Sequence, residues 1–246
     1  MRPPPELAAA VQTHGIGVWP EFSTGHQLAA LRSHADQLAT GPTALHFPTS
    51  TRVWDLHRHG PEFVNLLDHP GLQTLLDELL GADHLLSDHS LNVVRRGGRP
   101  DRWHIDYPYN EMRHLVTGAL LGVQCILALD DFTADNGATR HLPGSHRPPR
   151  RPDAGLNLDG EPVLADAGAL VVLAATTWHR SGTNRTDQPR RAILLSFVER
   201  WVRPMTDPPG PGPWARTERT RRLLGLERPP ETIDGHPITG PREEPA

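Results

Sequence analysis

The sequence predicts a mainly β domain with flanking α-helices. Between residues 85 and 203, short apolar runs alternate with turns rich in Asp, Asn, Gly and Pro, and no helical pattern separates them. Between residues 20 and 82, apolar residues instead recur at helical spacing. Closely spaced strands without intervening helices favour a closed or two-sheet β architecture. We therefore expect one domain over residues 1–203, with a helical part at about 20–82 and a β core at about 85–203.

The N-terminal part is expected to contain one short strand and two helical regions. Residues 15–19 are typical of a strand, and residues 21–38 carry leucines at helical spacing. Residues 61–80 repeat that spacing, but His69-Pro70 divides them into two helices. Residues 40–60 are polar and irregular, which predicts a loop long enough to be functional.

Seven later segments have the composition of strands bounded by turn residues. They are residues 91–95, 102–107, 115–129, 138–142, 170–174, 177–182 and 192–199. The chain after residue 203 is rich in proline and charge. We expect it to form a C-terminal extension over residues 204–246, with one short helix near residues 217–226.

Composition narrows the possible function classes. The formal net charge is −4, so the sequence gives no overall basic surface for nucleic acid. The longest apolar stretch is interrupted by Gln124 and is too short to cross a bilayer, so we expect no membrane segment. The single cysteine, Cys125, excludes an intramolecular disulfide and is typical of a reducing compartment. We expect a cytoplasmic protein in which Cys125 is a small buried hydrophobe.

The motif Trp103-His104-Ile105-Asp106 places a histidine and a carboxylate two residues apart. On a strand both side chains share a face, because successive residues point to opposite sides of the sheet. Alone, the pair is equally compatible with a surface hydrogen bond. A second histidine from a distant strand would complete two imidazoles and one carboxylate, a set that suits non-haem Fe(II) in oxygenases. His179 is the candidate for that second histidine.

Three segments occur in a specific order along the β region. They are WHID from residue 103, LALDDFTADNGATRHLPGSH from residue 127 and WHRSGTNRTDQPRRA from residue 178. Together they resemble the phytanoyl-CoA dioxygenase family of Fe(II)/2-oxoglutarate oxygenases, over about residues 15–202. The resemblance implies a double-stranded β-helix (jelly roll, cupin-like) backed by the N-terminal helices. It also implies an iron triad of His104, Asp106 and His179, with 2-oxoglutarate as co-substrate.

The resemblance extends to a candidate 2-oxoglutarate site. Arg190 stands where the family places the arginine for the distal carboxylate, and its planar fork suits bidentate binding. Ser181 is expected to share the inward face of His179 and to donate to the same carboxylate. Gln124 interrupts an apolar strand, so it either lines the pocket or is an edge residue. Arg191 is expected to point to the other face as a solvated charge.

The expected substrate contacts are Tyr107, Tyr109, Trp54 and His57. The loops at residues 40–60 and 147–161 are expected to act as lids, because loops on a rigid scaffold usually carry specificity. Eight further arginines either form a basic rim for an anionic substrate or serve as ordinary solvated cations in a chain that contains no lysine. They are residues 95, 96, 99, 102, 113, 147, 150 and 151.

The resemblance implies a dioxygenase that uses Fe(II), 2-oxoglutarate and O2, with ascorbate as the reductant in vitro. We expect it to hydroxylate an unactivated C–H bond of a small metabolite in bacterial secondary metabolism, with succinate and CO2 as co-products. Asp106 favours a non-halogenating oxidation, because related halogenases have a small residue in its place.

Several alternatives stay open at this point. Within the oxygenase class they are desaturation, cyclisation and epimerisation, which begin with the same hydrogen abstraction. Outside it, a jelly roll that binds a metal or small ligand without redox turnover uses the same ligands, because histidine and carboxylate are not selective for iron by affinity. We expect a monomer or a weak homodimer whose partner is a small-molecule substrate, and the sequence does not identify that substrate.

Overall fold

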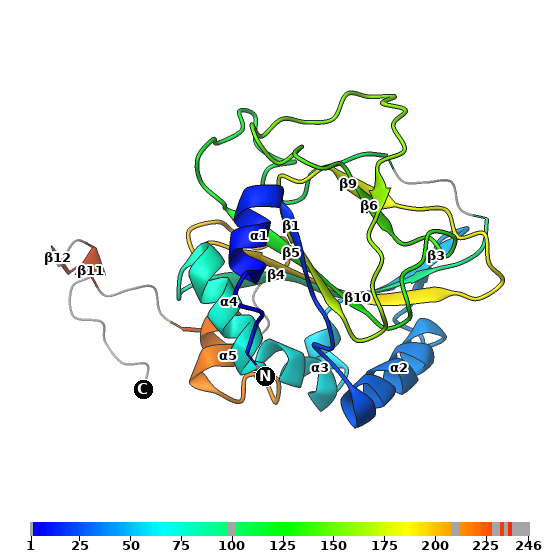
Figure 1. Cartoon of the computed structure of the whole chain (residues 1–246). Helices are drawn as coiled ribbons and strands as arrows, with labels where there is room; N and C mark the ends of the chain where they lie inside the picture. The colour runs from blue at the N-terminus through cyan, green and yellow to red at the C-terminus, as the bar shows by residue number, and fades with distance from the viewer. Residues whose placement is uncertain (1, 98–101, 208–211, 228–231, 234–235, 238–246) are drawn as a thin grey trace.

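Two antiparallel sheets form the centre of the computed structural model (Figure 1), which describes residues 2–97, 102–207, 212–227, 232–233 and 236–237. The larger sheet has seven strands in the order β1-β8-β5-β10-β4-β3-β2, and the smaller has three in the order β7-β6-β9. Their bounds are β1 Ile16–Trp19, β2 Leu45–His46, β3 Ser50–Val53, β4 Leu85–Val94, β5 Gly122–Ala128, β6 Thr139–His141, β7 Glu161–Pro162, β8 Leu170–Ala174, β9 His179–Ser181 and β10 Arg190–Val198. A separate pair consists of β11 Thr232–Ile233 and β12 His236–Pro237.

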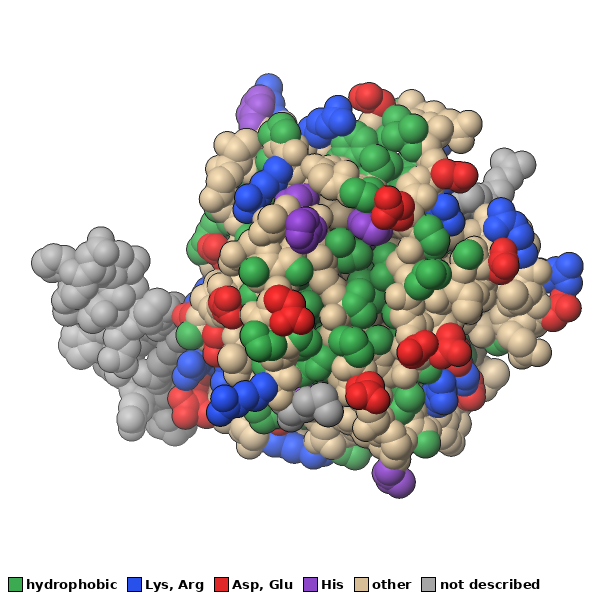
Figure 2. All heavy atoms as spheres, viewed as in Figure 1, with side chains coloured by type: hydrophobic (Ala, Val, Ile, Leu, Met, Phe, Trp, Pro, Cys, Tyr) green, Lys and Arg blue, Asp and Glu red, His purple; other side chains and the backbone are tan. Residues whose placement is uncertain are grey.

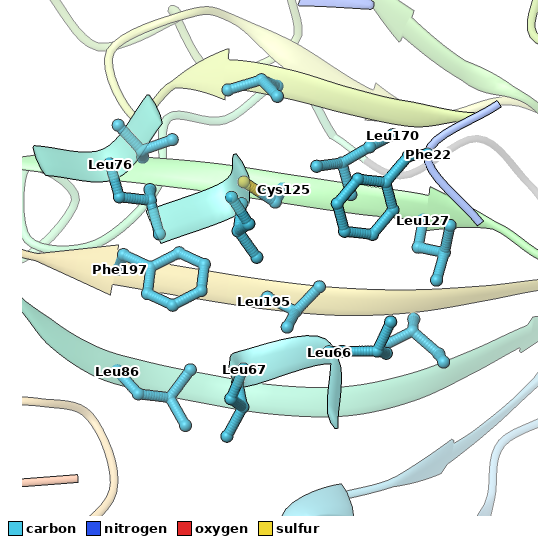
Figure 3. Close-up of a cluster of buried hydrophobic side chains, with 14 of the residues drawn as sticks. Phe22, Leu66, Leu67, Leu76, Leu86, Cys125, Leu127, Leu170, Leu195 and Phe197 are labelled. Atoms are coloured by element: carbon cyan, nitrogen blue, oxygen red, sulfur yellow. The ribbon is translucent and has the colours of Figure 1, made fainter. Parts of the chain in front are cut away.

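The outer face of the large sheet carries the main hydrophobic core. Along the central strand β10, Ile193, Leu195 and Phe197 are fully buried on this face, while the residues between them face inward. Cys125 of the neighbouring strand β5 is buried beside them, which confirms its expected role as a small apolar residue. Figure 3 shows this cluster packed against side chains from the covering helices, among them Leu66, Leu67 and Leu76.

Four helices cover this outer face: α1 Leu7–His14, α2 Gly25–Ala39, α3 Pro61–Leu67 and α4 Pro70–Leu80. Pro61 and Pro70 begin α3 and α4, where the missing N–H of proline removes no helical hydrogen bond. Between the two helices, His69 caps α4 by accepting a hydrogen bond from the Leu72 N–H at 3.1 Å. The predicted division at His69-Pro70 is therefore confirmed. A short 3-10 helix, η1 Leu56–Arg58, precedes α3.

The inner face of the large sheet packs toward the small sheet. A second apolar cluster fills one end of this interior, with Ile126, Val171 and Ala192 from three neighbouring strands of the large sheet. Phe132 and Ala138 join it from the connection between the two sheets. The other inward positions of the same strands are polar, and they line the cavity described below. One sheet therefore supports a helix-covered core on one side and a polar site on the other.

The C-terminal part returns to the main core. Helix α5, Glu218–Leu223, begins at Thr217, whose hydroxyl accepts a hydrogen bond from the Thr220 N–H at 3.0 Å. Leu223 and Leu224 are buried in the same core as the strands. The extension that we expected from residue 204 onward thus does not lie wholly outside the domain core.

The face of the molecule seen in Figure 2 carries charges of both signs. Figure 2 shows acidic and basic side chains interspersed over the visible face, with apolar side chains gathered toward its centre. None of the helices in the described part of the chain combines the length and the apolar character that a membrane span requires.

Four expectations for the secondary structure are wrong. Residues 115–129 are a strand only over β5, and residues 115–121 are irregular. Residues 102–107 form no strand and pair only through an isolated bridge at His104. Residues 40–60 are not a plain loop, because they contain β2, β3 and η1. Strand β4 begins at Leu85 rather than near residue 91, since Ser87 and His89 of its first half are buried and Asp88 is only partly exposed. In each case tertiary contacts override the local pattern.

Truncation of the central strand is expected to destabilise the fold. Leu195 is 0% exposed, so Leu195→Ala should lower the free energy of unfolding by about 2–5 kcal/mol through lost burial and a new cavity. The matched control is Leu164→Ala, at a leucine that is 62% exposed, which we expect to change this free energy by no more than about 0.5 kcal/mol. Urea unfolding followed by circular dichroism measures both. Equal stabilities of the two variants would contradict the packing described here.

Candidate metal centre and active site

A short antiparallel bridge brings His104 and His179 together. The backbone N–H of each donates to the carbonyl oxygen of the other at 3.1 Å. Their ring centroids are consequently 4.4 Å apart. Asp106 is fixed two residues later, where its N–H donates to the Ala175 carbonyl at 2.7 Å. Ile105 points the other way into a hydrophobic cluster, so the side chains of His104 and Asp106 project together.

The three side chains present their ligand atoms to one point. Asp106 Oδ1 lies 3.7 Å from His104 Nε2, and Asp106 Oδ2 lies 3.4 Å from His179 Nε2. One ligand atom from each residue lies within 4.8 Å of the others. Each imidazole Nδ1 lies 2.9 Å from a backbone carbonyl oxygen, Arg102 for His104 and Thr177 for His179. Because a carbonyl only accepts, Nδ1 carries the proton and the Nε2 lone pair faces the triad.

This donor set fits a divalent metal ion. Asp106 Oδ2 is buried and has no hydrogen-bond partner within the described residues. A buried carboxylate oxygen without a partner is costly, and a cation at this point would compensate it. Two neutral imidazoles and one carboxylate leave coordination positions open, which suits non-haem Fe(II) and its oxygen chemistry.

A cavity of about 190 Å³, the candidate active-site cavity, extends inward from the triad, and Arg190 lines it. Arg190 is the first residue of β10, and its side chain lies on the inward face of the strand. The residue is 2% exposed. Its Nη2 donates to the Gly137 carbonyl at 2.7 Å, and its guanidinium lies 4.6 Å from the centroid of the Phe132 ring. The next residue, Arg191, does point to the opposite face, but it is not simply solvated. It forms ion pairs with Asp130 and Asp36, at 2.6 and 2.7 Å.

Ser181 and Gln124 lie on the walls of the same cavity. Ser181 shares strand β9 with His179 and follows it by two residues, so the two side chains have the same direction. Gln124 projects from β5, which lies between β8 and β10 and is not an edge strand. The Gln124 side-chain oxygen accepts a hydrogen bond from the Ser196 hydroxyl of β10. Gln124 therefore lines the cavity and is not an edge residue.

The sequence matches the family model described as phytanoyl-CoA dioxygenase over residues 12–192. The chain belongs to the phytanoyl-CoA dioxygenase family. Among curated relatives of this family member are an uncharacterized protein of Mycobacterium tuberculosis, 30% identical over 158 residues, and dioxygenase af480 of Aspergillus fumigatus, 31% identical over 172 residues. These matches cover 61% and 65% of this chain, and 56% and 52% of the relatives. The chain thus spans about half the length of these relatives.

Solved structures of related fold support the architecture. The alpha-ketoglutarate-dependent epimerase SnoN from nogalamycin biosynthesis superposes with a TM-score of 0.67 at 21% identity, over 96% of this chain and 94% of SnoN. HygX from Streptomyces hygroscopicus gives a TM-score of 0.64 at 15% identity, over 80% and 88% of the two chains. This phytanoyl-CoA dioxygenase family member therefore has the double-stranded β-helix (jelly-roll) fold, backed by N-terminal helices, as the resemblance implied.

The four expected substrate contacts fall in different places in this family member. Tyr107 lines the active-site cavity, and Trp54 lines a second cavity next to it. Tyr109 does not reach either one. It is buried in a hydrophobic cluster, where its hydroxyl donates to the Ala119 carbonyl at 2.6 Å and accepts from the Leu121 N–H at 2.9 Å. Its position so soon after the Asp106 motif suggested a contact, but the ring turns into the protein.

His57 is also separate from the active-site cavity. Its ring is buried, and the centroids of the His57 and His89 rings are 6.1 Å apart. His89 belongs to β4 and pairs with Leu195 of β10, so it lies on the helix-covered face of the large sheet. Trp214 packs edge-on against the His57 ring, with ring centroids 6.2 Å apart. Burial lowers the pKa of His57 to about 4, so it is neutral at physiological pH. His57 therefore belongs to the packing between helices and sheet rather than to the substrate pocket.

Sequence reasoning missed a polar wall contributed by β3 and β4. Arg52, Asp88 and Asn92 line the active-site cavity together with Met205 from the C-terminal part. Part of the signal was present, because Asp88, Ser90 and Asn92 are polar at a spacing of two, although only residues 90–93 alternate polar and apolar side chains. Two features hid it: Ser87 and His89 make the segment read as a polar turn, and Arg52 lies in the expected loop.

The structure gives little support for the expected rim of arginines around an anionic substrate. None of residues 95, 96, 102, 113, 147, 150 and 151 lines the active-site cavity or its neighbour, and residue 99 lies outside the described part of the chain. Arg150 instead stacks on Trp178 at 4.5 Å, and Arg151 donates to backbone carbonyls near Asn110.

The loop at residues 147–161, which we expected to act as a lid, contributes no wall to the cavity. It packs against the side of the site, where Trp103 Nε1 donates to the Leu158 carbonyl at 3.1 Å.

Proposed function

We propose that the protein is an Fe(II)/2-oxoglutarate-dependent dioxygenase. One observation carries the proposal: the His104, Asp106 and His179 triad and the buried Arg190 guanidinium lie on the walls of one cavity. Membership of the phytanoyl-CoA dioxygenase family supports it. So do the ligands of proteins with the same fold, since SnoN was crystallised with Fe3+ and alpha ketoglutarate, and HygX with nickel and 2-oxoglutarate.

Each wall of the cavity then has a role. His104, Asp106 and His179 hold the iron, and the backbone carbonyls behind the two histidines keep each Nε2 available as a ligand. Bound iron would supply O2 activation coupled to the oxidative decarboxylation of 2-oxoglutarate to succinate and CO2. Arg190 binds the distal carboxylate of the co-substrate through its fork, and Ser181 donates to the same group.

The reaction on the substrate is proposed to be hydroxylation of an unactivated C–H bond in a small metabolite of secondary metabolism. One oxygen atom of O2 then enters the substrate and the other enters succinate. Ile126 and Leu194 add apolar surface to the cavity, which helps to exclude water while the C–H bond reacts. The fold shared with the epimerase SnoN favours epimerisation as the second candidate, because both reactions begin with abstraction of a hydrogen atom.

An anaerobic titration tests the cofactor assignment. We expect the metal-free protein to bind one Fe(II), and subsequent 2-oxoglutarate to produce the weak visible charge-transfer band of its iron chelate. Disappearance of this band in Arg190→Ala would connect the arginine to the co-substrate. Iron binding without a band in the unmodified protein would contradict the proposal and favour a metal-binding protein without redox turnover.

A further inference from the structure

A second cavity of about 530 Å³ adjoins the active site on the side of β3. The two cavities share three lining residues, Arg52, Asp88 and Met205. Apolar side chains at the outer end of the second cavity are unusually exposed: Phe47 is 47% exposed, Trp54 38% and Met205 51%. Large apolar side chains gathered around an opening are typical of ligand-binding sites. The second cavity is therefore the outer part of a single pocket that leads toward the triad.

Asp88 stands at the junction of the two cavities. It projects inward from β4, opposite Ser196 of β10. The Ser90 hydroxyl donates to Asp88 Oδ2 at 2.7 Å and fixes the orientation of the carboxylate. Within the described residues Asp88 has no ion-pair partner within 4 Å, although it lines both cavities. Asp88 is therefore a carboxyl group whose position is fixed at the junction of the two cavities.

The surroundings of Asp88 act on its carboxyl group in opposite directions. Burial raises the pKa of the Asp88 carboxyl group, and the nearby Asp55 carboxylate raises it further. The Ser90 hydrogen bond and the Arg52 guanidinium oppose this rise without cancelling it. The other charged residues of the inner cavity have roles of their own. Arg180 stacks on the Trp103 ring at 4.6 Å and donates to the Leu158 carbonyl at 2.9 Å. Asp106 belongs to the triad and Arg190 to the proposed co-substrate site. Asp88 is thus the anionic group left for the substrate.

We propose that Asp88 anchors the ammonium group of an amphipathic amine, whose apolar part lies against Phe47, Trp54 and Met205. The amine nitrogen would lie at the junction of the cavities, so that a carbon next to it extends toward the triad. A charge-assisted hydrogen bond inside the protein is stronger than one between neutral groups, which makes the ammonium group the main determinant of affinity. This assignment of the substrate class rests on the proposed dioxygenase function.

Arg52 offers the competing interpretation, in which an anionic substrate binds at the same junction. Two features argue against it. Arginine has a long, mobile side chain, and the Arg52 side chain is partly exposed, so solvent screens its charge. Asp88 is short and held by Ser90, so its position is fixed before any ligand arrives.

Three probes with one phenyl body separate these possibilities: 2-phenylethylamine, 2-phenylethanol and phenylacetate. Their affinities would be measured by anaerobic calorimetry with the holoprotein loaded with Fe(II) and saturating 2-oxoglutarate. We expect the amine to bind at least about 10-fold more tightly than the alcohol, as a charged hydrogen bond typically provides. In Asp88→Asn, which keeps the shape of the side chain, this preference should disappear. In Asp88→Glu it should persist in part.

The matched control is Asp153→Asn, at an exposed carboxylate that lines neither cavity, and it should keep the full preference. Thermal unfolding of each variant verifies that it is folded. Equal binding of amine and alcohol to the unmodified protein would overturn the inference, as would an undiminished preference in Asp88→Asn. Tightest binding of phenylacetate would overturn it in favour of Arg52. The charge-transfer band, recorded on the same samples, reports separately on the proposed function.

Discussion

Asp106→Ala is expected to abolish the formation of succinate from 2-oxoglutarate. The substitution removes the only carboxylate of the triad and leaves two neutral imidazoles 4.4 Å apart as the remaining ligands. Loss of a residue that merely orients a metal ligand typically lowers metal affinity by about 10–100-fold. Loss of the ligand itself should lower the affinity for Fe(II) by at least about 100-fold, which anaerobic calorimetry measures directly.

A histidine close to the triad provides the control for this prediction. His141 of β6 pairs with His179 in the small sheet, but it does not line the cavity. His141→Ala should therefore keep its affinity for Fe(II) and its succinate formation. If Asp106→Ala retained turnover without added halide, the triad would be assigned incorrectly. The same conclusion would follow if its iron affinity were unchanged.

Arg190→Ala is expected to raise the dissociation constant of 2-oxoglutarate by about 10–100-fold, in line with the loss of hydrogen bonds to a charged group. The affinity for Fe(II) should stay unchanged, because Arg190 is not a ligand of the triad. Calorimetry with 2-oxoglutarate on the Fe(II)-loaded protein under anaerobic conditions gives this constant.

The neighbouring arginine separates loss of a binding site from loss of stability. Arg191 projects from the opposite face of β10 and pairs with Asp130 and Asp36. Arg191→Ala should lower the melting temperature while leaving the affinity for 2-oxoglutarate unchanged. An unaltered affinity in folded Arg190→Ala would show that a different cation binds the co-substrate.

The parts of the fold that follow from local periodicity were predictable from the sequence. Residues 170–174 were predicted as a strand and form β8, and the helix division at His69-Pro70 follows from the stereochemistry of proline. The segment around His104 was not predictable as a single bridge. Its alternation resembles that of a strand, but whether a segment pairs along its length depends on a partner that is distant in the chain.

The residues of the candidate site were also predictable only in part. His104, Asp106, His179 and Arg190 could be chosen because sequence motifs mark them, and the structure brings them to one cavity. The substrate side of the pocket has no such motif. Asp88 and Arg52 reach it through the register of β3 and β4, where Arg52 pairs with Asn92. Tyr109 and His57 failed as choices because adjacency in sequence does not determine the direction of a side chain.

Strand β10 has a further consequence for how this protein can change during evolution. Its inward residues include Arg190 and Ser196, whereas Leu195 and Phe197 belong to the main core. Either set can be substituted one residue at a time without altering the other. A single-residue insertion or deletion within the strand would exchange the two faces for every residue on one side of the change, which moves polar side chains into the core or core leucines into the pocket. Changes of length in this protein should therefore be confined to its loops, and new substrates should be acquired through substitutions.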